Sequence, residues 1–139
     1  MKDYPTTALR NVVLLGHGSS GKTSLGEAML FSSGAISRQG RVEDGTTVSD
    51  FDEEEVRRHI SLTTALLPIE WQNYKINVLD TPGYTDFVGE VISAMRVADG
   101  VVILVDSVAG LEVGTEITWD YCDVFKLPRF LVVNKMDRD

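Results

Sequence analysis

Several features that mark other classes of protein are scarce in this sequence of 139 residues. It has one cysteine, Cys122, so no disulfide can form within the chain, and no cysteine and histidine cluster has the spacing of a metal site. Basic residues are few: 13 Lys and Arg against 21 Asp and Glu give a net charge of −8. This charge disfavours binding to DNA through a broad basic face, so any polyanion must be bound locally.

Long apolar runs are also missing. The longest, such as residues 101–105, are far shorter than a membrane-spanning helix, and the first residues, MKDYPTTALRN, lack the basic start and apolar stretch of a signal peptide. We therefore expect a cytoplasmic, monomeric protein without a membrane partner. With 4 Pro, 12 Gly and 43% hydrophobic residues, the composition is that of one globular domain with a single core.

Short apolar runs alternate with segments of helical character, which predicts an α/β fold with a mainly parallel sheet and helices on both faces. The predicted strands are residues 12–15, 62–71, 75–80, 101–105 and 130–133, the second and third joined by a turn at Gln72 and Asn73. The predicted helices are residues 22–31, 86–97 and 112–125. Residues 37–59 are mostly polar, and a loop of this length in a compact domain is usually functional or mobile, so we expect a switch there.

The first chemical motif, GHGSSGKT at residues 16–23, fits the phosphate-loop pattern GxxxxGK[ST]. Its glycines let consecutive backbone N–H groups surround an anion, and the N-terminus of the following helix adds the positive end of its dipole. We expect Lys22 to reach the outer phosphates and the hydroxyl of Thr23 to bind Mg²⁺. A glycine-rich turn that matches by chance is the alternative, and the flanking strand and helix argue against it.

A second motif, DTPG at residues 80–83, follows a predicted apolar strand. The carboxylate of Asp80 can hold Mg²⁺ through its water shell. Gly83 offers a backbone N–H that can approach a γ-phosphate because no side chain is in the way. The same residues would suit an ordinary turn, but their position directly after a buried strand favours the functional interpretation.

A third motif, NKMD at residues 134–137, follows the last predicted strand. The carboxylate of Asp137 can accept both N–H donors on the Watson–Crick edge of guanine, whereas adenine presents an acceptor there. Lys135 can lay its stem along the face of the base, and Asn134 can tie this loop to the phosphate loop. The motif therefore predicts a guanine nucleotide and disfavours an ATP-dependent enzyme.

With these motifs in this order, the sequence resembles the translational GTPases of the elongation factor G family, from residue 9 to residue 138. The resemblance includes DSVAG at residues 106–110 and EITW at residues 116–119. It implies a three-layer P-loop GTPase fold, GTP/GDP and Mg²⁺ as cofactors, the ribosome as partner, and hydrolysis of GTP to GDP and phosphate. It also implies a first switch near residues 46–62, where Ser61 takes the place of a threonine that binds Mg²⁺, and a second switch that starts at Asp80.

The resemblance and the motifs together give a set of expected site residues. The expected metal ligands are Thr23, Ser61 and Asp80, and the expected catalytic residues are Lys22, Gly83 and Tyr84. The expected nucleotide contacts are Gly16, His17, Gly18, Ser19, Ser20, Gly21, Lys22, Thr23, Ser24, Asp80, Gly83, Asn134, Lys135 and Asp137.

Four residues depart from the family pattern. Tyr84 stands where the family has the histidine that positions the attacking water, and a phenol is longer than an imidazole and a weaker acid. Ser61 keeps the hydroxyl of the family threonine, His59 replaces a glycine, and Ser19 replaces an aspartate. We therefore expect slow hydrolysis, with a GTP-binding switch that scarcely hydrolyses its nucleotide as the alternative.

Two further expectations concern the charged segment and the end of the chain. Residues 52–58 are interpreted as a solvated helical turn with a Glu53–Arg57 pair rather than as a contact surface. The sequence ends two residues after Asp137. We therefore expect residues 1–139 to be the N-terminal part of a GTP-binding domain without its final strand, closing helix and later domains. The last strand present is then expected to be exposed.

Overall fold

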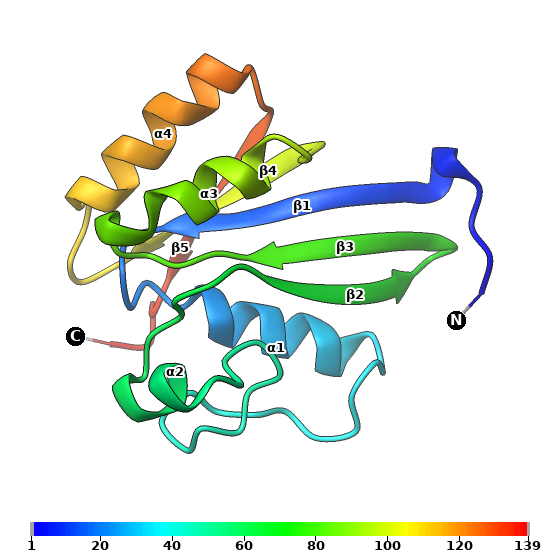
Figure 1. The fold of residues 1–139 in the computed structure, drawn as a ribbon, viewed down its shortest axis with the longest axis horizontal. Coiled ribbons are helices and arrows are strands. Elements are labelled where there is room, and N and C mark those ends of the chain that lie inside the picture. The colour runs from blue at the N-terminus through cyan, green and yellow to red at the C-terminus, as the bar shows by residue number, and fades with distance from the viewer. Residues whose placement is uncertain (1, 139) are drawn as a thin grey trace.

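The computed structural model describes residues 2–138, which build a five-stranded sheet in the order β2-β3-β1-β4-β5 (Figure 1). The strands are β1 (Leu9–Gly16), β2 (Ala65–Trp71), β3 (Tyr74–Asp80), β4 (Gly100–Asp106) and β5 (Arg129–Asn134). β2 runs antiparallel to β3, and all the other neighbours are parallel. Because parallel strands end at the same edge of a sheet, the three sequence motifs that follow β1, β3 and β5 come together.

Helices cover both faces of this sheet, as the sequence predicted. α1 (Lys22–Ser32) and α2 (Glu53–Arg58) lie on one side, and α3 (Val88–Met95) and α4 (Val113–Phe125) lie on the other (Figure 1). β1 is buried on both faces: Val13 and Leu15 pack in the core under α3 and α4, and Leu14 packs in the core that contains Leu30 of α1. This double burial explains why residues 12–15 of β1 are all apolar.

Each predicted strand and helix is present, with bounds that differ by a few residues. Gln72 and Asn73 join β2 to β3 with φ angles of 46° and 65°, as a tight two-residue hairpin turn requires. The strand predicted from residue 62 begins only at Ala65, because the preceding N–H groups of Leu62 and Thr63 donate to the side chain of Glu55 instead. The helix predicted from residue 86 starts as a 3-10 turn, Thr85–Phe87, before α3.

The charged segment at residues 52–58 corrects the sequence interpretation. It forms α2, which starts with a capping box in which Asp52 accepts from the backbone N–H of Glu54 and Glu55 accepts from that of Asp52. The predicted Glu53–Arg57 pair is wrong: Glu54 binds both Arg57 and Arg58, at 2.6 and 2.8 Å. Nor is the turn wholly solvated, since Glu55 is 1% exposed and accepts the N–H groups that precede β2.

The edge strand β5 has an apolar surface. The apolar side chains of Phe130, Leu131 and Val133 on β5, the edge strand of the sheet, are exposed, as expected. Over residues 2–138, the structure contains no helix with the length and apolar character needed to span a membrane.

Candidate functional site

The three motifs surround a single cavity of about 530 Å³ at the carboxyl ends of the parallel strands. Expected site residues that line it are Gly18, Ser19, Gly21, Lys22, Thr23, Ser24, Ser61, Gly83, Tyr84, Asn134 and Lys135. Expected site residues that do not line it are Gly16, His17, Ser20, Asp80 and Asp137. Gly16, Ser20 and Asp80 are buried and His17 is half-buried, whereas Asp137 is exposed beyond the end of β5.

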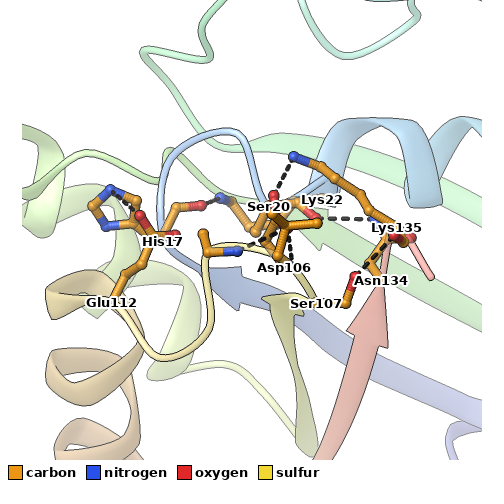
Figure 2. A network of polar contacts seen from close by, with 10 residues as sticks. His17, Ser20, Lys22, Asp106, Ser107, Glu112, Asn134 and Lys135 are labelled. Carbon is orange, nitrogen blue, oxygen red and sulfur yellow. Dashed lines mark hydrogen bonds and ion pairs between the residues drawn. The ribbon is translucent and has the colours of Figure 1, made fainter. Parts of the chain in front are cut away.

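A direct hydrogen bond joins the first and third motifs. The side-chain amide of Asn134 donates from Nδ2 to the carbonyl oxygen of Ser20 over 2.9 Å (Figure 2). The amide crosses directly above Gly21, whose φ of +101° already favours glycine and where a Cβ would overlap the Asn134 side chain. The residue that ends β5 therefore fixes the phosphate loop, as the sequence suggested for Asn134.

Lys22 lies at the base of the loop. Its side chain is buried, and Nζ donates to the carbonyl oxygens of Gly16 at 3.1 Å and His17 at 2.9 Å. Burial lowers the pKa of Lys22 to about 8, and the carboxylates of Asp80 and Asp50 oppose this change. The lysine thus remains mostly charged at pH 7 while it is shielded from water.

The three expected metal ligands meet beside α1. Thr23 Oγ1 donates to Asp80 Oδ2 over 2.8 Å and lies 3.2 Å from Ser61 Oγ. Ser61 in turn donates to Asp50 Oδ1 over 2.7 Å. Sequence reasoning missed Asp50, because the contact crosses the long polar segment and no local pattern indicates which of its many acids turns inward.

Asp80 provides a test of whether these oxygen atoms suit a cation. Its side chain is 1% exposed, and burial raises its pKa to about 6 against the hydrogen bond from Thr23 and the charge of Lys22. Within the described residues, its Oδ1 lacks a hydrogen bond of normal geometry, as does the buried Ser49 hydroxyl whose proximity lowers the same pKa. A buried carboxylate oxygen with this free capacity, next to two hydroxyls, matches the oxygen ligands that Mg²⁺ prefers.

The third motif is held by residues at the end of β4. Lys135 has a φ of 59°, and its Nζ is 2.5 Å from Asp106 Oδ2 (Figure 2). Ser107 donates from Oγ to the carbonyl of Lys135 and from its backbone N–H to that of Asn134, at 2.8 and 2.9 Å. The bond from Lys135 and the N–H group of Val108 lower the pKa of Asp106 to about 2. The sequence showed these residues only as part of a resemblance, without a role.

The two histidines near the site have different surroundings. His17 turns toward α4, where Nδ1 accepts from the N–H of Gly114 at 3.3 Å and Nε2 lies 3.5 Å from Glu112 (Figure 2). His59 lines the cavity, and its Nδ1 lies 3.0 Å from the carbonyl oxygen of Val42. Its φ is +55°, so the chain keeps a left-handed conformation at the position where the family has glycine.

The sheet order and the phosphate loop after β1 define a P-loop nucleotide-binding fold, and comparison with known proteins gives its family. Residues 7–139 match the model described as the elongation factor Tu GTP binding domain, and the chain belongs to this family of translational GTPases. The predicted fold class and the predicted resemblance are therefore confirmed.

Curated relatives are longer than this chain. It is 44% identical over 138 residues to the mitochondrial ribosome-releasing factor 2 of Lodderomyces elongisporus, covering 99% of this chain and 17% of that protein. It is 43% identical over 138 residues to elongation factor G 2 of Streptomyces coelicolor, covering 99% of this chain and 20% of that protein. The chain thus spans about a fifth of the length of these relatives or less.

Solved structures agree with the fold. The crystal structure of ttk003000868 from Thermus thermophilus has a TM-score of 0.91 and 42% identity, and the match covers 94% of this chain and 20% of that one. The elongation factor SelB of Methanococcus maripaludis, solved with the GTP analogue GppNHp, has a TM-score of 0.73 and 22% identity over 100% of this chain and 24% of that one. At this lower identity the second match supports the fold alone.

Proposed function

We propose that this chain binds Mg-GTP in the cavity and that the full-length protein hydrolyses it to GDP and phosphate in connection with the ribosome. The observation that carries the proposal is the hydrogen bond from Asn134 to Ser20, because it ties the base-recognition loop to the phosphate loop. Residues of all three motifs then line one cavity of about 530 Å³, a volume typical of small-molecule sites.

The phosphate loop and the NKMD loop supply the proposed nucleotide contacts. Backbone N–H groups of the loop surround the phosphates, and the buried charge of Lys22 lies among them. At the other end, the Asp137 carboxylate accepts the two guanine donors, and Lys135 packs along the base. The proposed contacts are Gly16, His17, Gly18, Ser19, Ser20, Gly21, Lys22, Thr23, Ser24, Asp80, Gly83, Asn134, Lys135 and Asp137.

Thr23, Ser61 and Asp80 would hold the magnesium ion. Their oxygen atoms are already grouped by hydrogen bonds, and the free Oδ1 of Asp80 adds a ligand without breaking any of them. When bound, Mg²⁺ neutralises negative charge on the phosphate oxygens.

Three residues carry the proposed chemistry. Lys22 stabilises charge that develops on the outer phosphate, Gly83 offers its backbone N–H there, and the phenol of Tyr84 orients the attacking water. Gly83 and Tyr84 both line the cavity next to Lys22, which supports these roles. Because a phenol is a poor substitute for imidazole, we expect slow turnover.

Tyr84 also favours a second candidate function, a GTP-binding switch with little or no hydrolysis. Single-turnover hydrolysis of GTP by the full-length protein, with and without ribosomes, separates the two functions. Hydrolysis that ribosomes stimulate supports the enzyme, and a rate indistinguishable from buffer in both cases supports the switch. Tyr84→His should raise the rate if the rest of the site is intact.

The first test of the proposal is nucleotide selectivity. Calorimetry on the full-length protein with Mg²⁺ should detect GTP binding and an affinity for ATP at least about a hundredfold lower, since adenine opposes a lone pair to the Asp137 carboxylate. Chelation of Mg²⁺ should weaken GTP binding. Equal affinity for ATP and GTP would contradict the proposal. Cytoplasmic location stays a prediction, because the relative from Lodderomyces elongisporus is named as a mitochondrial protein. The monomeric state also stays a prediction.

A further inference from the structure

Gly18 is the point where the second switch touches the phosphate loop. If Gly18 carried a Cβ, the three nearest atoms would be ring atoms of Tyr84, with Cζ at 2.9 Å and the two Cε atoms at 3.1 and 3.2 Å. From the other partner, a Cβ on Gly83 would lie 2.7 Å from both N and Cα of Gly18. Two consecutive residues of the switch therefore rest on a loop residue that has no side chain.

The backbone alone does not explain a glycine at this position. Gly16 and Gly21 of the same loop have φ angles of +136° and +101°, where a side chain is strained, but Gly18 is not among the residues with positive φ. Alanine would fit the backbone of Gly18, and the three atoms nearest to its Cβ would lie at the far end of the Tyr84 ring. The contact with this ring is thus the feature of the described residues that favours a glycine.

The contact also determines where the phenol lies. The atoms nearest to Gly18 are Cζ and its two neighbours, so the hydroxyl-bearing end of Tyr84 is the part that lies over the loop. The same stretch of the switch approaches Lys22 Nζ, since a Cβ on Gly83 would overlap that atom. Gly83 and Tyr84 both line the cavity that buried Lys22 also lines.

We propose that Gly18 is a positioning residue for Tyr84: its missing side chain seats the ring on the phosphate loop and so sets where the phenol hydroxyl meets the outer phosphate and its attacking water. This inference rests on the proposed function. It adds that the ring of Tyr84 fits only over a residue without a side chain, so the effect of a substitution at residue 18 depends on the residue at position 84.

A neighbouring cavity makes the proposal testable without unfolding the protein. This second cavity, of about 170 Å³, lies on the side of α3 and α4 and is lined by Tyr84 itself together with Val88, Ile117 and Tyr121. A methyl group added at residue 18 has to displace only the end of a flexible side chain, and this space can accept it. We therefore expect Gly18→Ala to fold and to move the ring off its seat.

The contact between Gly18 and the Tyr84 ring can be observed by NMR. His17-Gly18 is the only histidine–glycine pair in this sequence. Labelling the full-length protein with carbonyl-¹³C histidine and ¹⁵N glycine reduces an HNCO spectrum to its histidine–glycine pairs. The peak that disappears in Gly18→Ala is then the Gly18 amide. Tyr84→Leu should shift this peak because the ring current is lost, whereas Tyr74→Leu, on β3, should leave it in place. An unchanged peak in Tyr84→Leu would overturn the seating.

The functional part is a double-mutant cycle on single-turnover GTP hydrolysis. In the Tyr84 background, Gly18→Ala should lower the rate about ten- to hundredfold, since a displacement of about 1 Å in a reacting group can cost this much. In the Tyr84→Phe background, which keeps the ring but lacks the hydroxyl, Gly18→Ala should change the rate less than about threefold. All rates are compared at saturating GTP, so that a change in the GTP dissociation constant does not affect the coupling measured by the cycle.

Gly89→Ala is the matched control, because its added Cβ meets open space on α3 and should leave the rate unchanged. Equal losses from Gly18→Ala in both backgrounds would overturn the proposal, since residue 18 would then act on the phosphates and not through Tyr84. If the wild-type protein binds GTP without hydrolysing it, the proposed hydrolysis fails and the positioning role fails with it. If it hydrolyses GTP but the cycle is additive, only the role of Gly18 fails.

Discussion

We predict that Glu27 attaches the long polar segment between α1 and α2 firmly to α1. This glutamate lies in α1, one turn after Thr23, and its side chain is fully buried. Its Oε2 accepts the backbone N–H of Gly40 at 3.0 Å, and its Oε1 accepts that of Val48. Both partners belong to the long polar segment that connects α1 to α2, so one carboxylate holds this segment at two points.

Glu27→Gln isolates the contribution of the charge. The amide has nearly the same shape, and its oxygen can keep one of the two bonds, but its NH₂ group faces the other backbone N–H as a second donor. A hydrogen bond to a charged group contributes about 1.5–3 kcal/mol, so the loss of one should destabilise the closed segment by about 2 kcal/mol. Local opening should then be about 30 times more frequent.

Hydrogen exchange measures this opening. In Glu27→Gln, the amides of residues 38–50 should exchange about 30-fold faster, while those of the buried strand β1 should change much less. Glu116→Gln, at an exposed position on α4, is the control for the loss of a charge from a helix and should leave exchange in the segment unchanged. Unaltered exchange at Gly40 and Val48 in Glu27→Gln would refute the idea that this carboxylate holds the switch.

Three further predictions test the base site and its support. Asp137→Asn should weaken GTP binding by more than about tenfold and favour xanthosine triphosphate, because the C2 carbonyl of xanthine accepts a hydrogen bond from the new amide. Competition binding measures this preference. An unchanged preference for GTP would place base recognition elsewhere. Asn134→Ala removes the hydrogen bond to Ser20, which contributes about 1 kcal/mol. Calorimetry should therefore show GTP binding about fivefold weaker. A wild-type affinity would show that this hydrogen bond is dispensable. The pKa of Asp106 is about 2, below its ordinary value of 3.8, so its pairing with Lys135 should add stability above pH 3.8 and lose that contribution as the pH falls through 2. A ¹³C carboxyl titration with an ordinary midpoint would contradict the pairing.

The parts of the site that could be predicted from the sequence are those encoded by short contiguous patterns. The loop at residues 16–23, DTPG and NKMD each carry their chemistry within a few residues, and each follows an apolar run. The rule that parallel strands end at one edge turns their order in the chain into proximity in space. For this reason the contact between Asn134 and Ser20, which joins residues 114 positions apart, could be anticipated.

The parts that could not be predicted depend on which acids turn inward. Glu27, Asp50 and Glu55 make buried contacts with groups 7 to 21 residues away, across a segment that has no periodic pattern. A charged run such as residues 52–58 is usually solvated, so the burial of Glu55 and the pairing of Glu54 in place of Glu53 appear only in the structure. The composition gives the number of acidic residues but does not show which of their side chains are buried.

These buried acids bear on how a polyanion can enter the cavity. Asp50 and Asp80 both raise the pKa of Lys22, which is the only buried cation among the described residues, so two buried carboxyl groups face one buried ammonium group. The N–H groups of the phosphate loop offset part of this charge, but they cannot cancel the repulsion between Asp80 and an outer phosphate a few ångströms away. A divalent cation between the Asp80 carboxylate and the outer phosphate would attract both anions and so offset their mutual repulsion. We therefore expect the carboxylates of Asp80 and Asp50, which hold Thr23 and Ser61 in place, to make triphosphate binding depend on the metal more strongly than diphosphate binding.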